Sequence, residues 1–441
     1  MKEISLKHAV MQSFTSIGPM LDFIALFSVI AVYSGILLPL VIIFSFLLSY
    51  FTLYSIYGLS KIFITNGGYY SYVGNLLGKD AGIFIFLLFL GYSLLTVPNI
   101  ADFISAFLSS ILNLSGVTKT IAQYLIIILF IGLVYLTVAG GLKISIKYTL
   151  IAGLLEIIFI LFLSTIFFIY RNPDFSISMI KFKFNPFFFG IIFGILAFSG
   201  GGSSIFLSEK TNVSPRNTPK SLLISFTISG IIMSISAFAL VFFIGYKGLL
   251  NYEVNPLYII SIISDKFGYI FMIIFSLFGI FSGFNLSVSY LNAFMNMIPR
   301  FHSDFNFGYK LNIRKLMVLL FILSLAISIS STYLIGAFTA FVIIAGVISF
   351  LYIIIHIFAN ISLIKYHMGR KFLVPALSSL FLSIAFIFSF ISNSGYFVVI
   401  NYILASYVII SIILVVYIKT LKNKFYSKIR FDHGIDKSTG S

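Results

Sequence analysis

The sequence predicts an all-α polytopic membrane protein of about twelve transmembrane helices, each roughly 20 residues long. Three observations support this fold class. Of the 441 residues, 60% are hydrophobic and only 9% are charged, against about 25% charged in a soluble domain. The mean hydropathy is +1.11, and long apolar runs recur along the whole chain. This composition excludes a soluble enzyme, a disulfide-rich secreted domain and a disordered chain.

The apolar runs are separated by short turns and charged residues, with no room for a soluble domain between them. The first run is too long for the apolar part of a signal peptide and is followed at once by a second run, so we interpret it as a spanning helix. The predicted spans lie near residues 12–33, 36–59, 81–112, 119–139, 148–170, 187–208, 221–244, 267–298, 314–332, 334–363, 372–393 and 396–418.

The positive charges predict the orientation of these spans. Of the 28 Lys and Arg residues, 22 fall in segments on the same side as the N-terminus and 6 on the other side. Because Lys and Arg are retained in cytoplasmic loops, we expect a multi-pass protein of the plasma membrane with both termini in the cytoplasm. Residues 421–441 form a basic tail, which either lies near anionic lipid headgroups or simply flanks the last span.

Two spans contain helix-breaking residues at matching positions, five spans apart. Proline removes a backbone donor, and each glycine costs about 1 kcal/mol relative to alanine within a helix. Interrupted helices at corresponding places in two halves of a chain are typical of a transporter substrate site; close helix packing is the alternative explanation. The two segments are Ser16-Ile17-Gly18-Pro19 in the first span and Phe198-Ser199-Gly200-Gly201-Gly202-Ser203 in the sixth.

Motifs around these spans resemble those of the amino acid–polyamine–organocation (APC) superfamily of secondary transporters. The loop after the second span, from Asn66 to Val73 and closing at Gly78, is similar to a glycine- and tyrosine-rich family signature. Residues from Phe198 to Lys220, with Glu209 and Pro215-Arg216-Asn217, are similar to a second signature, and Arg300 matches an arginine-bearing loop. The resemblance covers about residues 5 to 420.

This resemblance implies a fold of five plus five helices related by an inverted repeat, with two further helices. The first repeat would cover about residues 12–171, the second about 187–366, and the extra helices about 372–418. The substrate would lie between broken helices 1 and 6, where half-helix ends suit the carboxylate and ammonium groups of an amino acid. The implied substrate-binding residues are Ser16, Ile17, Gly18, Pro19, Asp22, Phe198, Ser199, Gly200, Gly201, Gly202 and Ser203. The family's aromatic residue after the helix 6 glycine is replaced here by Gly201, so we expect Phe198 or another side chain to cover the substrate.

Three acidic residues, Asp22, Asp102 and Glu156, fall inside predicted spans. An intramembrane carboxyl group is costly and indicates function by default. Asp22 follows the first break and either meets the substrate amine or caps the second half of the helix. Glu156, where many family members carry a buried lysine, and Asp102 are the candidates for proton coupling, although a neutral structural glutamate remains the alternative. No Lys or Arg within the spans is expected to pair with them.

Asn285, Ser287 and Ser289 in the eighth span form a possible cation site, which leaves sodium open as the coupling ion. Hydroxyl groups in apolar helices otherwise bond to their own backbone. We expect no metal site.

The sequence therefore predicts a secondary active transporter that moves amino acids by alternating access, with proton-coupled symport as its mode. An amino acid or polyamine exchanger and a transporter-derived membrane sensor are the alternatives. Enzyme activity is not expected, because the sequence has no zinc-protease motif, nucleophile elbow or phosphate loop. We expect no cofactor and no nucleic acid partner; the partners would be a small amine or amino acid, a proton or sodium ion, and the lipid bilayer.

Overall fold

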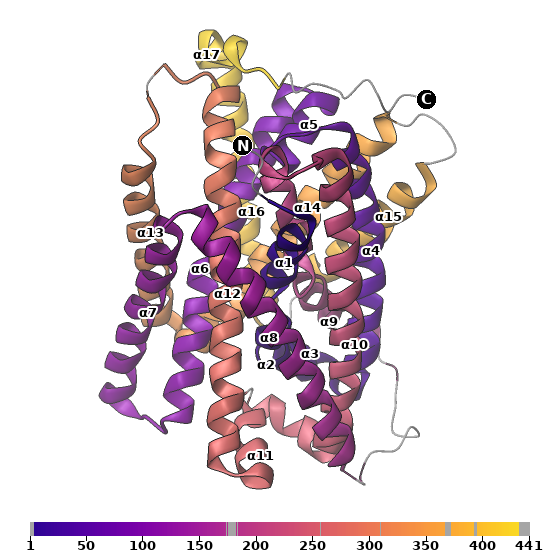
Figure 1. Cartoon of the computed structure of the whole chain (residues 1–441), viewed down its shortest axis with the longest axis vertical. Helices are drawn as coiled ribbons and strands as arrows, with labels where there is room; N and C mark the ends of the chain where they lie inside the picture. The colour runs from indigo at the N-terminus through magenta and orange to yellow at the C-terminus, as the bar shows by residue number, and fades with distance from the viewer. Residues whose placement is uncertain are drawn as a thin grey trace.

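The computed structural model describes residues 4–172, 174, 182, 184–255, 257–308, 310–366, 372–391 and 395–431. These residues are almost entirely helical (Figure 1). The elements are α1 (Leu6–Ile17), α2 (Pro19–Ile24), α3 (Leu26–Ser34), η1 (Gly35–Leu37), α4 (Leu38–Ile62), α5 (Tyr69–Leu77), α6 (Lys79–Ile111), α7 (Gly116–Ala139), α8 (Leu142–Ile169), α9 (Phe184–Leu196), η3 (Ser199–Lys210), α10 (Ser214–Val254), α11 (Tyr258–Phe267), α12 (Tyr269–Asp304), α13 (Ile313–Ile335), α14 (Ala337–Tyr366), α15 (Leu373–Phe390), α16 (Phe397–Leu421) and α17 (Asn423–Lys428).

The number of spans agrees with the sequence prediction. Eleven helical segments of the described chain are long and apolar enough to cross a membrane. One of them joins α3 to α4, and when α4 is separated from the interrupted α1–α3 segment the spans number twelve. The predicted fold class is confirmed: the protein is a helical membrane protein whose first and sixth spans are interrupted.

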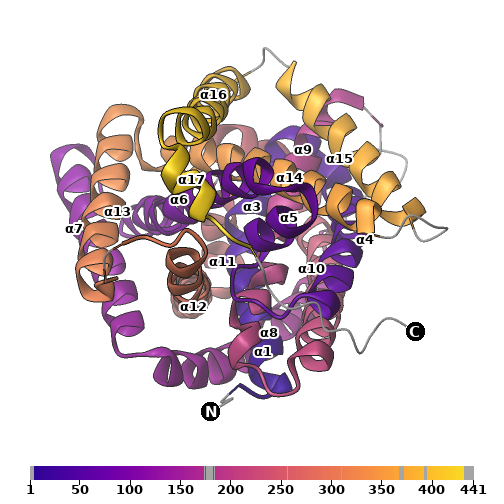
Figure 2. The ribbon, with the colours of Figure 1, turned by 90° about the horizontal axis from the view of Figure 1, so that it is seen from above.

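The interrupted spans lie at the centre of the bundle. The most apolar stretch of the span formed by α9 and η3 is 94% buried, whereas that of α16 is 17% buried. Figure 2 shows α7, α13, α15 and α16 at the periphery. Their exposed faces carry large apolar side chains such as Leu129, Leu319 and Ile413. These helices therefore present the surface that suits lipid, and the central helices are available to form a site.

Several elements differ from the sequence prediction. The short helices α5, α11 and α17 were not expected, because each is too short or too polar to resemble a span. Helix α10 extends well beyond the predicted 221–244 and is interrupted at Gly245, where φ is +74°. The basic tail, expected at 421–441, begins with α17, and Phe431 is buried against the protein; the tail from residue 432 lies outside the described residues.

Candidate functional site

The first interruption is the Gly18-Pro19 pair predicted from sequence. Gly18 adopts a left-handed conformation with φ +65°, and its N–H donates to the Phe14 carbonyl at 3.3 Å. Pro19 then occupies the first position of α2, where its missing N–H costs nothing. The chain therefore ends one helix and starts another within a single residue, without leaving the bundle.

The second interruption lies directly against the first. After α9 the chain continues as the tight 3-10 helix η3, which contains all three consecutive glycines. A Cβ atom on Gly200 would collide with the Ser16 carbonyl, one on Gly201 with the Phe226 ring, and one on Gly202 with the Tyr69 hydroxyl. The triple glycine therefore allows close packing on three sides, and at Gly200 the packing partner is the backbone of the first break.

Hydroxyl groups join the two breaks. Ser16 Oγ lies 2.7 Å from Ser203 Oγ, and Ser203 Oγ donates to the Gln12 carbonyl at 3.1 Å. The Ser204 N–H donates to Ser13 Oγ at 3.1 Å. These bonds satisfy polar groups that lipid could not satisfy. They hold α1 and η3 together along a line of hydrogen bonds inside an apolar bundle, which we call the polar seam.

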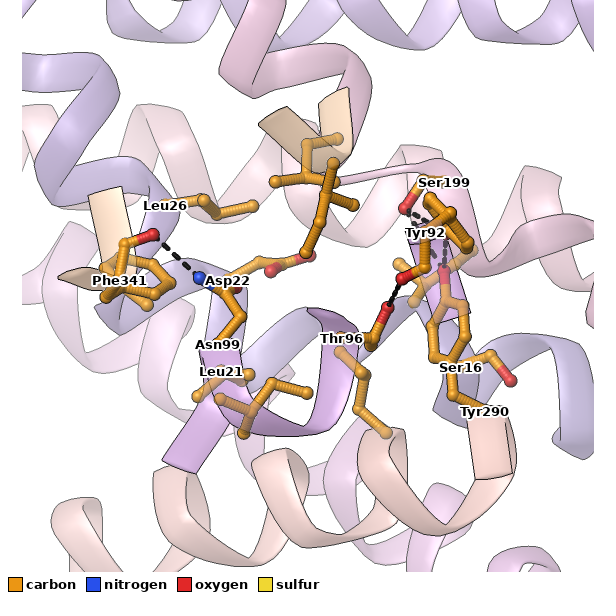
Figure 3. Close-up of a pocket in the computed structure, with 16 residues that line it drawn as sticks. Ser16, Leu21, Asp22, Leu26, Tyr92, Thr96, Asn99, Ser199, Tyr290 and Phe341 are labelled. Carbon is orange, nitrogen blue, oxygen red and sulfur yellow. Dashed lines mark hydrogen bonds between the residues drawn. The ribbon is translucent and has the colours of Figure 1, made fainter. Parts of the chain in front are cut away.

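A cavity of about 40 Å³ lies beside this seam (Figure 3). It has room for a few water molecules, so an amino acid would enter only if neighbouring side chains moved. The lining residues are Ser16, Ile17, Leu21, Asp22, Ala25, Leu26, Tyr92, Thr96, Asn99, Ile100, Leu196, Ser199, Leu286, Tyr290, Phe341 and Ile348.

The hydroxyl groups of Tyr92, Ser199 and Tyr290 lie between this cavity and a smaller one. The Tyr92 hydroxyl donates to Ser199 Oγ at 3.1 Å and also contacts the Tyr290 hydroxyl. Ser199 Oγ lies 3.2 Å from the Tyr290 hydroxyl. The smaller cavity, of about 10 Å³, is also lined by Tyr69, Phe89, Gly200, Ser203, Phe206 and Tyr352.

The structure brings only some of the predicted substrate-binding residues to these cavities. Ser16, Ile17, Asp22 and Ser199 line the first, and Ser199, Gly200 and Ser203 line the second. Gly18, Pro19, Gly201 and Gly202 shape the backbone but are not among the lining residues. Phe198, expected as a cover for the substrate, packs instead against Phe46 and Phe226, whereas Tyr92 and Tyr290 line both cavities.

Asp22 is buried, and its Oδ2 atom has no hydrogen-bond partner among the described residues. Figure 3 shows its carboxyl group between Asn99 and Phe341 on one side and the tyrosine cluster on the other. The alternative role as a helix cap does not match this geometry, because the start of α2 has no side-chain cap from its own segment.

The side chain of Glu156, on α8, caps the start of α2 instead. Its Oε1 accepts the Met20 N–H at 2.9 Å and the Ser282 hydroxyl at 2.5 Å. Its Oε2 has no partner among the described residues, and the Asn285 side chain lies beside it. Asp22 is close enough for the two carboxyl charges to interact. The partners of Oε1 are a backbone N–H and a hydroxyl rather than the Lys or Arg that the sequence provided no reason to expect, and a negative charge at a helix N-terminus is favourable.

Asp102 lies away from both cavities lined by helix 1. It accepts hydrogen bonds from three hydroxyls of α13: that of Ser328, that of Ser331 at 3.0 Å and that of Thr332 at 3.3 Å. Thr332 also lines a separate cavity of about 670 Å³. Asp102 and Glu156 are therefore two distinct buried carboxyl groups, one beside the large cavity and one at the helix break.

The possible cation site on α12 is not assembled as a single cluster. Asn285 lies beside Glu156, whereas Ser289 Oγ lies 2.8 Å from Thr15 Oγ1 on α1. Asn285 and Ser289 are four residues apart and share one face of the helix, but Ser287 lies two residues from each and points elsewhere. The structure therefore brings Asn285 to Glu156 of α8 and Ser289 to Thr15 of α1, and Ser287 joins neither contact.

A polar network joins the motif residues that carried the family resemblance. Arg300 Nε lies 3.0 Å from Asp304 and Arg300 Nη1 lies 3.6 Å from Glu209. The Tyr70 hydroxyl donates to Asp304 at 2.9 Å, and Asn66 and Glu209 each donate a backbone N–H to the other's side chain at 3.0 Å. This network connects α5, η3 and α12 at the end of the molecule where α5 and α17 lie (Figure 1). We call it the inner network.

Sequence reasoning missed Tyr290, Thr96, Asn99 and Phe341 in the cavity lining. No signal in the sequence distinguished Tyr290 and Phe341, because the chain contains 26 Tyr and 53 Phe residues. Most of the inner network could have been found, since all its residues except Asp304 are those of the recognised motifs.

Comparison with known proteins agrees with this architecture. The profile of a family described as amino acid permease matches residues 4–418. Three structures of mutants of the Eremococcus coleocola manganese transporter align with TM-scores of 0.58 to 0.60 at 12% to 13% identity, covering 95% of each chain. At this identity the likeness concerns the fold. A search of curated proteins found no match.

Proposed function

The chain belongs to the amino acid permease family, and from that premise we propose that it is a secondary active transporter of amino acids or related amines. We propose alternating access as its mechanism and proton-coupled symport as its mode. The chain would act in the plasma membrane with both termini in the cytoplasm.

The contact between the two helix breaks supports this proposal best. Gly200 packs on the Ser16 carbonyl, beside a cavity that holds the buried Asp22 carboxyl. Interrupted helices that meet at a buried polar cavity are a recurrent feature of secondary transporters. Access from alternate sides would require the short segments on either side of each break to move relative to the bundle.

Glu156 is our candidate for the coupling group. As a carboxylate it would hold the Met20 N–H at the start of α2, and a proton on it would remove the charge that favours this helix end. Protonation of Glu156 would then loosen the contact between α8 and α2, next to the substrate cavity. A sodium ion held by Glu156 and Asn285 would act on the same contact. Asp102, beside the large cavity, is the second proton-coupling candidate.

The manganese named for the structural neighbours suggests a second substrate class. Mn²⁺ prefers several oxygen ligands such as carboxylate, carbonyl and water. Among the described residues that line the first cavity, Asp22 alone carries a carboxyl group, which is few such ligands for Mn²⁺. We therefore propose an organic substrate and include Mn²⁺ in the test.

The test is uptake into proteoliposomes that contain the purified chain. Labelled amino acids, amines and Mn²⁺ are each measured with an imposed proton gradient, an imposed sodium gradient, or internal substrate alone. Symport predicts accumulation against a concentration gradient when a proton gradient is imposed. Uptake that requires internal substrate would show an exchanger, and the absence of saturable flux for every compound would contradict the transporter proposal in favour of a sensor.

The domain division follows from the same proposal. We propose one transporter domain over residues 1–420, with the repeats at about 12–171 and 187–366 and the extra helices at about 372–418. Each repeat would then begin with one of the two interrupted spans, which accounts for their matching positions.

A further inference from the structure

The start of α2 offers no backbone donor to a substrate carboxylate. The Gly18 N–H donates to Phe14 O at 3.3 Å, and Pro19 has no N–H. The Met20 N–H donates to Glu156 at 2.9 Å and the Leu21 N–H donates to Ser282 Oγ at 3.0 Å. The Asp22 N–H donates to Gly18 O at 3.0 Å. A helix start can bind an anion only through its unpaired N–H groups, and here the chain uses them itself.

The cavity also carries a negative group and no positive one. Among the described residues that line the two cavities there is no Lys, Arg or His. The Asp22 Oδ2 atom is buried, lines the first cavity and has no partner among the described residues. A buried carboxylate without a partner is costly, so it favours a ligand that brings a positive charge. A ligand carboxylate at the same place would add a second negative charge instead.

Aromatic rings surround the space next to Asp22. Tyr92, Tyr290 and Phe341 line the first cavity, and Tyr69, Phe89 and Phe206 are among the rings that line the second. The faces of aromatic rings attract cations and accept apolar carbon chains. A substrate with an ammonium group at Asp22 could therefore extend an aliphatic or aromatic body past the hydroxyls of Tyr92, Ser199 and Tyr290.

We propose that this site selects organic amines that lack a carboxylate next to the amino group, rather than zwitterionic amino acids. Asp22 would pair with the ammonium group, and the aromatic lining would accept the rest of the molecule. This inference rests on the proposed transport function and names its substrate class. The start of η3 is the place where a carboxylate would have to bind if the inference is wrong.

Two sets of three compounds, an amine, its amino acid and the amino acid amide, test this directly. Binding to the detergent-solubilised full chain is measured by calorimetry for phenethylamine, phenylalanine and phenylalaninamide, and for cadaverine, lysine and lysinamide. The amides keep the bulk of the amino acid but remove its negative charge. We expect each amine and each amide to bind at least about tenfold more tightly than the parent amino acid.

An amino acid that binds as tightly as its amine would overturn the inference. Flux of the same compounds in proteoliposomes separates this result from failure of the proposed function. Saturable uptake of amino acids without uptake of amines would leave the transporter intact and the amine preference wrong. If no compound binds and none is transported, both proposals fail.

Asp22→Asn gives a second readout. We expect it to weaken amine binding at least about tenfold while the thermal unfolding temperature stays close to that of the unmodified chain. The matched control is Asp174→Asn, which removes an exposed carboxyl that lies 3.9 Å from Lys247 and should leave binding unchanged. If Asp22→Asn binds amines as well as the unmodified chain does, Asp22 is not the ammonium partner and the inference is overturned.

Discussion

At the scale of single residues, the two candidate proton-coupling carboxyls, Glu156 and Asp102, have different surroundings. Asp102 is held by three hydroxyls from one helix, which all point at it. Glu156 instead links three elements, because it accepts from Met20 of α2 and Ser282 of α12 while belonging to α8. A change in the charge of Glu156 would therefore act on the relative position of helices, whereas a change at Asp102 would act on one helix contact.

We expect Glu156→Gln to abolish accumulation driven by a proton gradient and to leave exchange intact. Glutamine keeps an oxygen that accepts the Met20 N–H, so the variant should fold, but it cannot take up a proton. In a proton symporter, uptake rises as the external pH falls at a fixed internal pH, because proton entry becomes more favourable. Uptake by the variant should be flat over this pH range. Accumulation with an unchanged pH dependence would show that Glu156 is only structural.

At the scale of elements, the contact between α1 and η3 depends on the absence of side chains. Gly200 meets backbone atoms of Ser16, which cannot move aside as a flexible side chain could. The interrupted spans therefore form one structural unit, in which the break in each helix makes room for the break in the other.

Gly200→Ala should lower the free energy of unfolding by about 1 to 3 kcal/mol, the usual cost of overpacking, and should eliminate transport. The control is Gly132→Ala in α7, where a new Cβ would have no neighbour within 4 Å. That variant should be neutral or slightly stabilising, because alanine favours helix. Thermal unfolding of both variants, followed in detergent, measures the difference. Equal unfolding temperatures would contradict the close packing at Gly200.

The inner network is the second element-scale feature. Tyr70 lies in the short helix α5. Its burial, and to a lesser extent the neighbouring Asp304 carboxyl, raise the pKa of the Tyr70 hydroxyl well above its usual value. Tyr70 therefore stays protonated at neutral pH and remains a donor to Asp304. The network would hold α5 against α12 and close the path from the smaller cavity to that end of the molecule.

Tyr70→Phe should open this path more often, because it removes a hydrogen bond to an acidic group worth about 1.5 to 3 kcal/mol. The chain has no cysteine, so a single Ala293→Cys variant reports access to the smaller cavity, which Ala293 lines. A water-soluble maleimide should label this cysteine faster when Tyr70→Phe is also present. Equal labelling rates would show that the network does not close the path.

At the scale of the whole molecule, the C-terminal segment reaches back to the inner network. The Arg430 N–H donates to the Asp304 carbonyl at 2.9 Å. The Phe431 ring lies 6.0 Å from those of Tyr70 and Phe305, against Gly74 of α5 and Gly82 of α6. Earlier in the chain, Lys419 of α16 and the Tyr426 hydroxyl of α17 each lie 2.6 Å from Asp80 of α6. The tail therefore fastens α5 to the bundle from outside.

Phe431→Ala should weaken this attachment by about 3 kcal/mol, the lower end for removing a buried phenylalanine. Hydrogen exchange in α5 should become faster, since α5 would lose the Phe431 ring that packs against Gly74. Lys428→Ala, at an exposed position of α17, is the control and should leave exchange unchanged. Exchange in α5 that is unaffected by Phe431→Ala would show that the C-terminal segment does not hold this helix.

The sequence by itself determined the membrane class, the spans and the two interruptions. Bilayer thickness fixes the length of an apolar run, and Gly18-Pro19 and the three glycines act locally on the helix that contains them. The tertiary structure alone decided which side chains meet across the bundle. Glu156 is 136 residues from Met20, and Tyr92 is 198 residues from Tyr290. Such contacts depend on how helices pack, and in a chain this rich in tyrosine and phenylalanine no local pattern distinguishes an aromatic residue in the cavity from one that faces lipid.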